Sequence, residues 1–246
     1  PKEKRKAESL AAKCLDGDFS CLKRENYLIR LAVILVCAVN VRRRYAERGI
    51  PDGIFLDTMS DIKIWCSNAD NKGIKNYGWL KNHLRLELFR LGRLQFQLYE
   101  CKNRTLNYKK LPFSYGERVI YVHIPQGERL DTERCRESFA AAELFFERYF
   151  PEYEYKRYFC ESWLLFSKMD DLLPKRSNIR TFKERFEVIH DHLYDKGDYS
   201  EMWRLYDMDF TGDLEDFPAD STLRKNYRQF LKEGGQVGEG YGIFFW

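Results

Sequence analysis

Residues 119–149 constrain the fold most, because an apolar strand there runs directly into an amphipathic helix. The strand alternates between two largely apolar faces, one with Ile120, Val122 and Ile124 and the other with Val119, Tyr121 and His123. A strand that is apolar on both faces lies deep in a sheet. In the segment that follows, apolar residues recur at steps of four and three, which predicts a helix that packs one side onto the sheet. These residues are Cys135, Phe139, Ala142, Phe146 and Tyr149. Asp131 is the predicted N-cap of this helix, since its carboxylate can accept from free amides of the first turn.

The connection between this strand and helix is a candidate binding loop. It reads Pro125-Gln126-Gly127 and leads to the helix N-terminus, where unpaired N–H groups can hold a phosphate or a carbonyl oxygen. An ordinary strand-to-helix turn is the alternative interpretation.

Composition excludes several classes of protein. The 246 residues are 44% hydrophobic and 16% aromatic, which is enough for a sizeable core. The 42 Lys and Arg residues are interspersed with 38 Asp and Glu residues, so the +4 charge forms no basic stripe and predicts no nucleic-acid partner. Seven cysteines without a Cys-x-x-Cys pair indicate reduced thiols in the cytoplasm.

Targeting signals are absent from the sequence as given. There is no signal peptide, and the longest apolar run, residues 31–39, is too short to span a bilayer, so we expect no membrane partner. Because the chain begins at Pro1 without an initiator Met, we expect it to be a trimmed form of a longer protein.

The spacing of the hydrophobic residues changes near Gly92, which predicts a domain boundary there. Residues 1–92 predict a helical domain, including a helix at residues 25–47 buried on most sides and another at residues 80–91. From Arg93 the period becomes two, which predicts a half-buried strand whose polar side is formed by Arg93, Gln95 and Gln97. Residues 93–246 therefore predict a second domain, and the whole chain predicts an α+β fold with α/β-like alternation in its second part.

Further strands are predicted at residues 158–165, 202–206 and 237–246. The last strand ends in Phe244, Phe245 and Trp246, which either join the core or contact another subunit, so a homodimer is an expectation. The polar link to the central strand passes through Leu111 and Pro112.

Two patterns resemble metal sites but are incomplete. The acidic run at residues 207–213 lacks the glutamate that a calcium loop requires, since Pro218 stands at the twelfth position. His190 and His192 have no third ligand at a recognisable spacing. We therefore predict no metal.

Several segments, in order, resemble a known family. They are Gly92-Arg93-Leu94-Gln95-Phe96, Val122-His123-Ile124-Pro125-Gln126-Gly127, Cys135-Arg136-Glu137-Ser138-Phe139, Phe159-Cys160-Glu161-Ser162-Trp163-Leu164-Leu165, Leu173-Pro174 and Ser177-Asn178-Ile179. Together they resemble bacterial acyltransferase-like proteins with a helical N-acyltransferase N-terminal domain and a GNAT-like C-terminal domain. The resemblance covers nearly the whole chain.

The resemblance implies a mixed, mostly antiparallel sheet flanked by helices. It also implies that acetyl- or acyl-coenzyme A is held where residues 119–124 and 158–165 splay apart, with its pyrophosphate on the following loop. The implied cofactor-binding residues are Ile124, Gln126, Gly127, Arg129 and Asn178. Typical GNAT loops contain more glycine, whereas this loop has one and places Glu128 and Asp131 where they would repel an anion.

Acyl transfer to an amine needs a base and a group that protonates the leaving thiolate. His123 has a suitable ordinary pKa, and burial would raise the pKa of Glu161 towards the useful range. Ser162 could donate a proton or position a water. The alternatives are that His123 is a hydrogen-bonded core residue and that Glu161 pairs with an arginine. Strand alternation places Glu161 and Ser162 on opposite faces, so both cannot serve one pocket.

The sequence thus predicts an acyl-coenzyme A-dependent acyltransferase acting on an amine of a small molecule. A non-catalytic binding or scaffold protein that keeps the fold without coenzyme A is the alternative hypothesis, favoured by the two carboxylates in the loop.

Overall fold

The computed structural model describes residues 2–101 and 113–244. The chain divides into two compact units, one formed by Pro1–Tyr99 with Ile120–Tyr155 and the other by Glu100–Val119 with Lys156–Trp246. The predicted link at Leu111 and Pro112 and the apolar end at Phe245 and Trp246 lie outside the described residues.

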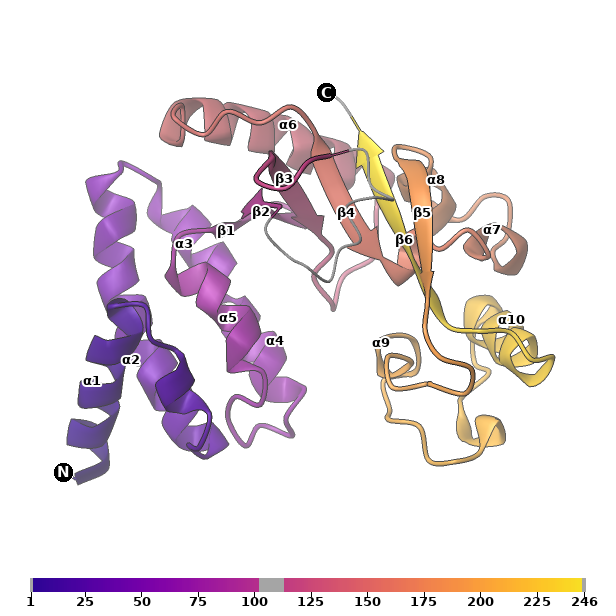
Figure 1. The fold of residues 1–246 in the computed structure, drawn as a ribbon, viewed down its shortest axis with the longest axis horizontal. Helices are drawn as coiled ribbons and strands as arrows, with labels where there is room; N and C mark the ends of the chain where they lie inside the picture. Colours follow the sequence, from indigo (N-terminus) through magenta and orange to yellow (C-terminus); the bar gives the residue numbers. More distant parts are fainter. Residues whose placement is uncertain (1, 102–112, 245–246) are drawn as a thin grey trace. The chain divides into compact units, whose positions relative to one another are not determined.

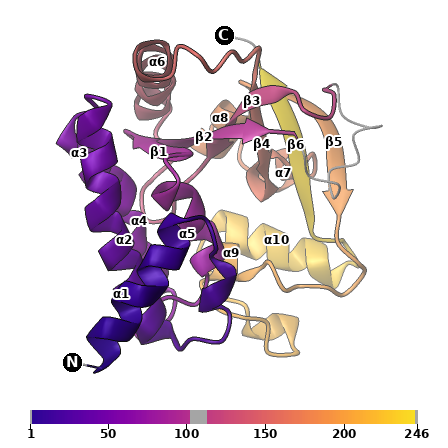
Figure 2. The same ribbon diagram turned by 60° about the vertical axis from the view of Figure 1, so that its left-hand side comes forward.

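The first unit begins with helices and ends with a hairpin, a strand and a long helix (Figures 1 and 2). Its elements are α1 (Lys2–Leu15), η1 (Ser20–Leu22), α2 (Tyr27–Glu47), α3 (Asp52–Met59), α4 (Asp61–Ser67), α5 (Tyr77–Leu84), β1 (Leu88–Leu91), β2 (Leu94–Glu100), β3 (Arg118–His123) and α6 (Thr132–Tyr149). The strands follow the order β1-β2-β3, and β1 pairs antiparallel with β2.

Helix α6 confirms the predicted cap and packed side. The Asp131 side chain accepts from the Arg134 N–H at 2.9 Å. The predicted stripe is buried at Cys135, Phe139, Ala142 and Phe146. A close contact joins α6 to the β1–β2 turn, because the Ser138 hydroxyl accepts from the Arg93 N–H at 2.8 Å. Gly92 has φ +73°, and a Cβ there would stand 2.9 Å from the Ser138 oxygen, so glycine suits this turn.

The helix predicted at residues 80–91 is wrong in its second half. Helix α5 ends at Leu84, Leu86 takes a left-handed φ of 58°, and strand β1 follows. The apolar residues of this segment fit both a helix and a short buried strand, and the left-handed residue separates the two.

Helix α2 is less buried than its composition suggests. Leu28, Leu35 and Val39 are 65%, 49% and 69% exposed and share one side of the helix.

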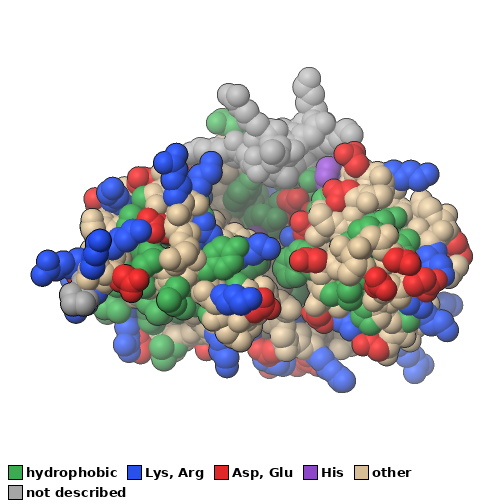
Figure 3. Space-filling view, turned by 90° about the horizontal axis from the view of Figure 1, so that it is seen from below, with side chains coloured by type: hydrophobic (Ala, Val, Ile, Leu, Met, Phe, Trp, Pro, Cys, Tyr) green, Lys and Arg blue, Asp and Glu red, His purple; other side chains and the backbone are tan. Residues whose placement is uncertain are grey.

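Figure 3 shows Lys and Arg side chains gathered over the N-terminal helices at the left of the view. None of the helices in the described part of the chain combines the length and apolar character needed to cross a bilayer.

The strand predicted from Arg93 is confirmed as β2, but its predicted half-burial is wrong. The polar residues Arg93, Gln95 and Gln97 are 3%, 1% and 8% exposed, and Leu94 and Phe96 on the other face are fully buried. The polar face is covered because Arg93 meets backbone carbonyls of the loop after β3, and Gln97 meets the His123 side chain, instead of water.

The second unit combines antiparallel strands with short helices. Its elements are β4 (Tyr158–Ser162), η3 (Trp163–Leu165), α7 (Met169–Leu172), α8 (Asn178–Lys183), β5 (Glu187–Leu193), α9 (Trp203–Tyr206), η4 (Leu214–Asp216), α10 (Thr222–Lys232) and β6 (Gly238–Phe244). The strand order is β4-β6-β5, and both pairs are antiparallel. In β6, a Cβ at Gly240 would stand 2.2 Å from the Leu165 carbonyl oxygen, so only glycine fits.

Two strand predictions in this unit need correction. The strand predicted at residues 158–165 ends at Ser162, because the Ser162 hydroxyl accepts from the Leu164 N–H at 3.2 Å and starts η3. In the segment 202–206, Met202 is the N-cap of the short helix α9 (Trp203–Tyr206), which buries Leu205 and Tyr206 in the core of this unit.

The predicted α+β class is confirmed, with helices first and strands mixed with helices after them. Gly92, the predicted domain boundary, lies in the β1–β2 turn inside the first unit. The division into domains 1–92 and 93–246 stays a prediction.

Candidate functional site

The loop between β3 and α6 is held by one buried guanidinium. Arg93 donates from Nη1 to the Pro125 carbonyl at 3.0 Å, from Nη2 to the Glu128 carbonyl at 2.6 Å and from Nε to the Arg129 carbonyl at 2.8 Å. No hydrogen bond among the described residues uses the backbone N–H of Gly127, Glu128 or Arg129. The loop is therefore fixed through its carbonyls, and these three N–H groups remain available to an anion.

The two loop carboxylates are both occupied within the protein. Glu128 pairs with Arg90 at 2.5 Å and with Arg134 at 2.6 Å, and these arginines, Arg134 first, lower the pKa of Glu128. Asp131 caps α6. The sequence prediction counted the two acids and overlooked that Arg90, Arg93 and Arg134 would gather around them. The expected repulsion of an anion is therefore offset by these cations.

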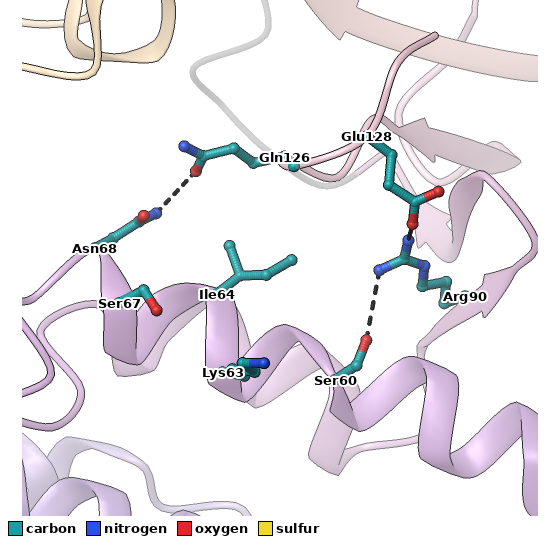
Figure 4. Close-up of a pocket in the computed structure, with 9 residues that line it drawn as sticks. Ser60, Lys63, Ile64, Ser67, Asn68, Arg90, Gln126 and Glu128 are labelled. Atoms are coloured by element: carbon teal, nitrogen blue, oxygen red, sulfur yellow. Dashed lines mark hydrogen bonds and ion pairs between the residues drawn. The ribbon is translucent and has the colours of Figure 1, made fainter. Parts of the chain in front are cut away.

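A hollow of about 400 Å³ lies beside this loop. It is lined by Ser60, Lys63, Ile64, Ser67, Asn68, Arg90, Gln126, Gly127 and Glu128 (Figure 4). Two contacts span it: the Asn68 amide donates to the Gln126 side-chain oxygen at 3.1 Å, and Arg90 reaches the Ser60 hydroxyl at 3.4 Å. Helix α4 and the loop thus form the two walls of one hollow. The predicted residues Gln126 and Gly127 line it, whereas Ile124 and Arg129 do not.

His123, at the end of β3, is half-buried between aromatic rings and meets one polar side chain. Its Nε2 lies 2.9 Å from the Gln97 side-chain oxygen, and its ring meets Tyr121 at 4.0 Å and Trp79 edge-on at 4.8 Å between centroids. Burial, with a smaller contribution from His83, lowers the pKa of His123 to about 3. The expectation of a pKa suited to base catalysis near neutrality is therefore wrong.

Asp61 is the centre of a polar cluster that the sequence interpretation missed. It is 3% exposed, and its Oδ2 accepts from Trp79 Nε1 at 2.7 Å and Trp65 Nε1 at 3.3 Å, with His83 Nε2 at 3.0 Å. Burial acts to raise the pKa of Asp61, but His83 first, and then Trp79 and Gln95, hold that pKa below its usual value. The available signal was spacing: Asp61 and Trp65, like Trp79 and His83, stand four residues apart on one helix face.

The remaining predicted residues belong to the second unit. Glu161 stands opposite Tyr241 in the β4–β6 pair and hydrogen-bonds with it; burial first, and then the Glu161 charge, raise the pKa of Tyr241. Ser162 caps η3, and Asn178 is the first residue of α8. The structure thus brings His123 and the loop residues into one unit, and Glu161, Ser162 and Asn178 into the other. Their assigned roles stay predictions.

The described residues contain no group of three or more His, Cys, Asp or Glu side chains that could hold a metal ion. All seven cysteines are free of disulfide bonds.

Comparison with known proteins identifies two domains. The profile of the GNAT-like C-terminal domain matches residues 88–244, and that of the N-acyltransferase N-terminal domain matches residues 3–86. Among curated proteins, none matches the chain.

Solved structures of acyltransferases resemble the chain over 89% of its length. One, in complex with decanoyl-CoA and teicoplanin, is 26% identical with a TM-score of 0.77. Another, in complex with CoA and 10C-teicoplanin, is 25% identical with a TM-score of 0.77. A mutant in complex with octanoyl-CoA is 26% identical with a TM-score of 0.75. The chain spans 66% of the length of each of these proteins.

Proposed function

Since the chain belongs to the family with a GNAT-like C-terminal domain, we propose that it is an N-acyltransferase that moves an acyl group from acyl-coenzyme A to an amine of a small molecule. The arrangement of the β3–α6 loop carries this proposal. Arg93 binds three loop carbonyls, and adjacent N–H groups of the loop that precedes α6 have no partner among the described residues. Such N–H groups are the usual ligands of a diphosphate.

The cofactor in this proposal is an acyl-coenzyme A of medium chain length. The similar acyltransferases were solved with decanoyl- and octanoyl-CoA, which supports that range for this chain. Its pyrophosphate would contact the loop at Gln126, Gly127 and Arg129, and Ile124 would lie beside the pantetheine arm. Asn178 stays a predicted cofactor contact.

The reaction requires the amine nitrogen to attack the thioester carbonyl, lose a proton and expel the thiolate of coenzyme A. Glu161 is the proposed base. His123, with a pKa of about 3, is neutral at pH 7 and too weak a base to take a proton from an ammonium group, so we assign it a hydrogen-bonding role. Ser162, the third predicted residue, lies on the opposite face of β4 from Glu161 and accepts from the Leu164 N–H, so we assign it no step in the same pocket.

The acceptor is proposed only as a class, an amine-bearing small molecule. Because a similar acyltransferase was solved in complex with teicoplanin, glycopeptides should be the first acceptors tested. Cytoplasmic location and a homodimer remain predictions from the sequence.

The non-catalytic alternative is favoured by one observation. His123 is bonded to Gln97 and Ser162 caps a turn, so two of the three predicted catalytic groups already have structural partners. Such a protein could retain the fold and either bind coenzyme A without turnover or not bind it at all.

Thermal unfolding with and without decanoyl-CoA tests the proposal. A ligand at a hundred times its dissociation constant stabilises the folded state by about 2.7 kcal/mol, which raises the melting temperature by several degrees. If millimolar decanoyl-, octanoyl- and acetyl-CoA all leave the melting temperature unchanged, the proposal is rejected.

Turnover is then measured as release of free coenzyme A thiol across a panel of amines. Glu161→Gln should abolish most turnover and leave binding of decanoyl-CoA nearly intact. Binding without turnover on any amine would favour the non-catalytic alternative.

A further inference from the structure

Lys63 is the feature of the hollow that the proposed reaction does not use. It projects from α4, in the part of the chain matched by the N-terminal domain, and lines the hollow together with Gly127. Its side chain makes no ion pair within the described residues, whereas Arg90 beside it is paired with Glu128 at 2.5 Å. The hollow therefore has one cation that is not already neutralised by a neighbouring carboxylate.

The residues of α4 that line the hollow lie on one face of the helix. Ser60, Lys63, Ile64 and Ser67 follow one another at steps of three, one and three, so they face the hollow together. Figure 4 shows them below the loop that carries Gln126 and Glu128. This face offers a positive charge, two hydroxyls and one apolar side chain, a set that suits a phosphate attached to an organic group.

We propose that α4 forms the second half of the phosphate site, and that Lys63 binds a phosphate of the nucleotide part of coenzyme A. This inference rests on the proposed function. The loop N–H groups hold one side of the phosphates and the Lys63 ammonium holds the other. The loop has a single glycine, so its backbone approaches the phosphates at fewer positions than in a glycine-rich loop. A cation supplied by the helical domain compensates for that difference.

The wall positions are fixed by contacts that do not involve Lys63. The Asn68–Gln126 hydrogen bond of 3.1 Å joins the end of α4 to the loop, and Arg90 joins Ser60 to Glu128. Replacing the exposed Lys63 should therefore leave the hollow in place. The stability of the variant should stay within about 0.5 kcal/mol of the wild type.

Ligand truncation separates a phosphate contact from any other effect of the lysine. Binding of decanoyl-CoA and of S-decanoyl-pantetheine, which lacks the nucleotide and its phosphates, is measured by calorimetry for wild type, Lys63→Gln and Lys75→Gln. Lys75 is a matched control, because it is also exposed in the first unit and lies outside the hollow. Its removal changes the net charge by the same amount.

Lys63→Gln should weaken binding of decanoyl-CoA about tenfold, as expected for a charge-assisted hydrogen bond, and leave binding of S-decanoyl-pantetheine unchanged. Lys75→Gln should change neither. The inference is overturned if Lys63→Gln weakens both ligands equally, matches Lys75→Gln, or has no effect. Those results leave the proposed function standing, whereas a wild type that binds no decanoyl-CoA rejects the proposed function and this inference with it.

Discussion

Arg93 and Asp61 are both buried charges of the first unit, but their partners differ in kind. Arg93 is surrounded by backbone carbonyls of a loop, and Asp61 by ring N–H groups of side chains on α4 and α5. The first arrangement fixes the path of a backbone. The second fixes the orientation of aromatic rings, including Trp79, which meets His123 edge-on. The comparison shows two ways to satisfy a buried charge without an exclusive ion pair.

Replacing Arg93 should have the largest effect. Arg93→Met keeps most of the side-chain volume but leaves the carbonyls of Pro125, Glu128 and Arg129 without their donors. We expect the free energy of unfolding in urea to fall by about 3–5 kcal/mol and binding of decanoyl-CoA to be lost. Arg129→Met, at an exposed position of the same loop, is the control and should change stability little. A loss of less than about 1 kcal/mol for Arg93→Met would show that the loop holds its shape unaided.

Replacing Asp61 should come second. In Asp61→Asn the amide oxygen can take the place of Oδ2, but the negative charge that faces His83 and the indoles of Trp65 and Trp79 is lost, so the charge-assisted contacts become neutral ones. The expected loss in the free energy of unfolding is about 2–4 kcal/mol, measured by urea titration. Tryptophan emission should shift as well, since two indoles lose a charged partner. Asp57→Asn, on an exposed site of α3, controls for the change in charge. If the two variants were equally stable, the cluster would have no energetic role.

The pH dependence of stability tests the lowered pKa of His123, whose ring contacts Trp79 of this cluster. The pKa of His123 is lowered from 6.5 to about 3 in the folded state. Below pH 6.5 the unfolded chain takes up a proton that the folded chain does not, so stability is complete above pH 6.5 and is lost as the pH falls towards 3. The slope for one proton is about 1.4 kcal/mol per pH unit.

Urea unfolding at about pH 7 and pH 5 should therefore show a difference of about 1–2 kcal/mol that His123→Gln removes. The exposed His192→Gln variant is the control and should keep the wild-type difference. Equal pH dependence in wild type and His123→Gln would mean that the histidine titrates normally in the folded protein.

The same comparison explains what the sequence could predict. Local signals were sufficient for α6, where an acidic cap and apolar residues at steps of three and four identify one helix. The same signals did not predict the burial of β2. Alternation shows that Gln95 and Gln97 share one face of the strand, but it does not show whether that face meets water or other polar groups. The end of helix α5 near Leu86 was not predicted, because leucine rarely takes a left-handed φ and nothing in the sequence marks this one.

The candidate site shows the same limit. The loop itself was predicted from the strand, the glycine and the cap. Arg90, which pairs with the Glu128 carboxylate, and Arg93, which binds the Glu128 backbone carbonyl, come from β1 and the β1–β2 turn, 38 and 35 residues earlier in the sequence. Contacts over that separation depend on how the elements pack, so the sequence could count charges near Glu128 but could not pair them.

Replacing Glu128 should have the smallest effect on stability, and it separates the roles of backbone and side-chain contacts in the loop. Arg93 uses the Glu128 backbone carbonyl, while the Glu128 carboxylate, 37% exposed, pairs with Arg90 and Arg134. Glu128→Gln removes the ion pairs and retains the carbonyl, so the free energy of unfolding should fall by less than about 1 kcal/mol. Glu133→Gln, which breaks the exposed pair with Arg136, should cost a similar amount. A loss above about 2 kcal/mol for Glu128→Gln would mean that side-chain charge, and not the backbone contact with Arg93, holds the loop.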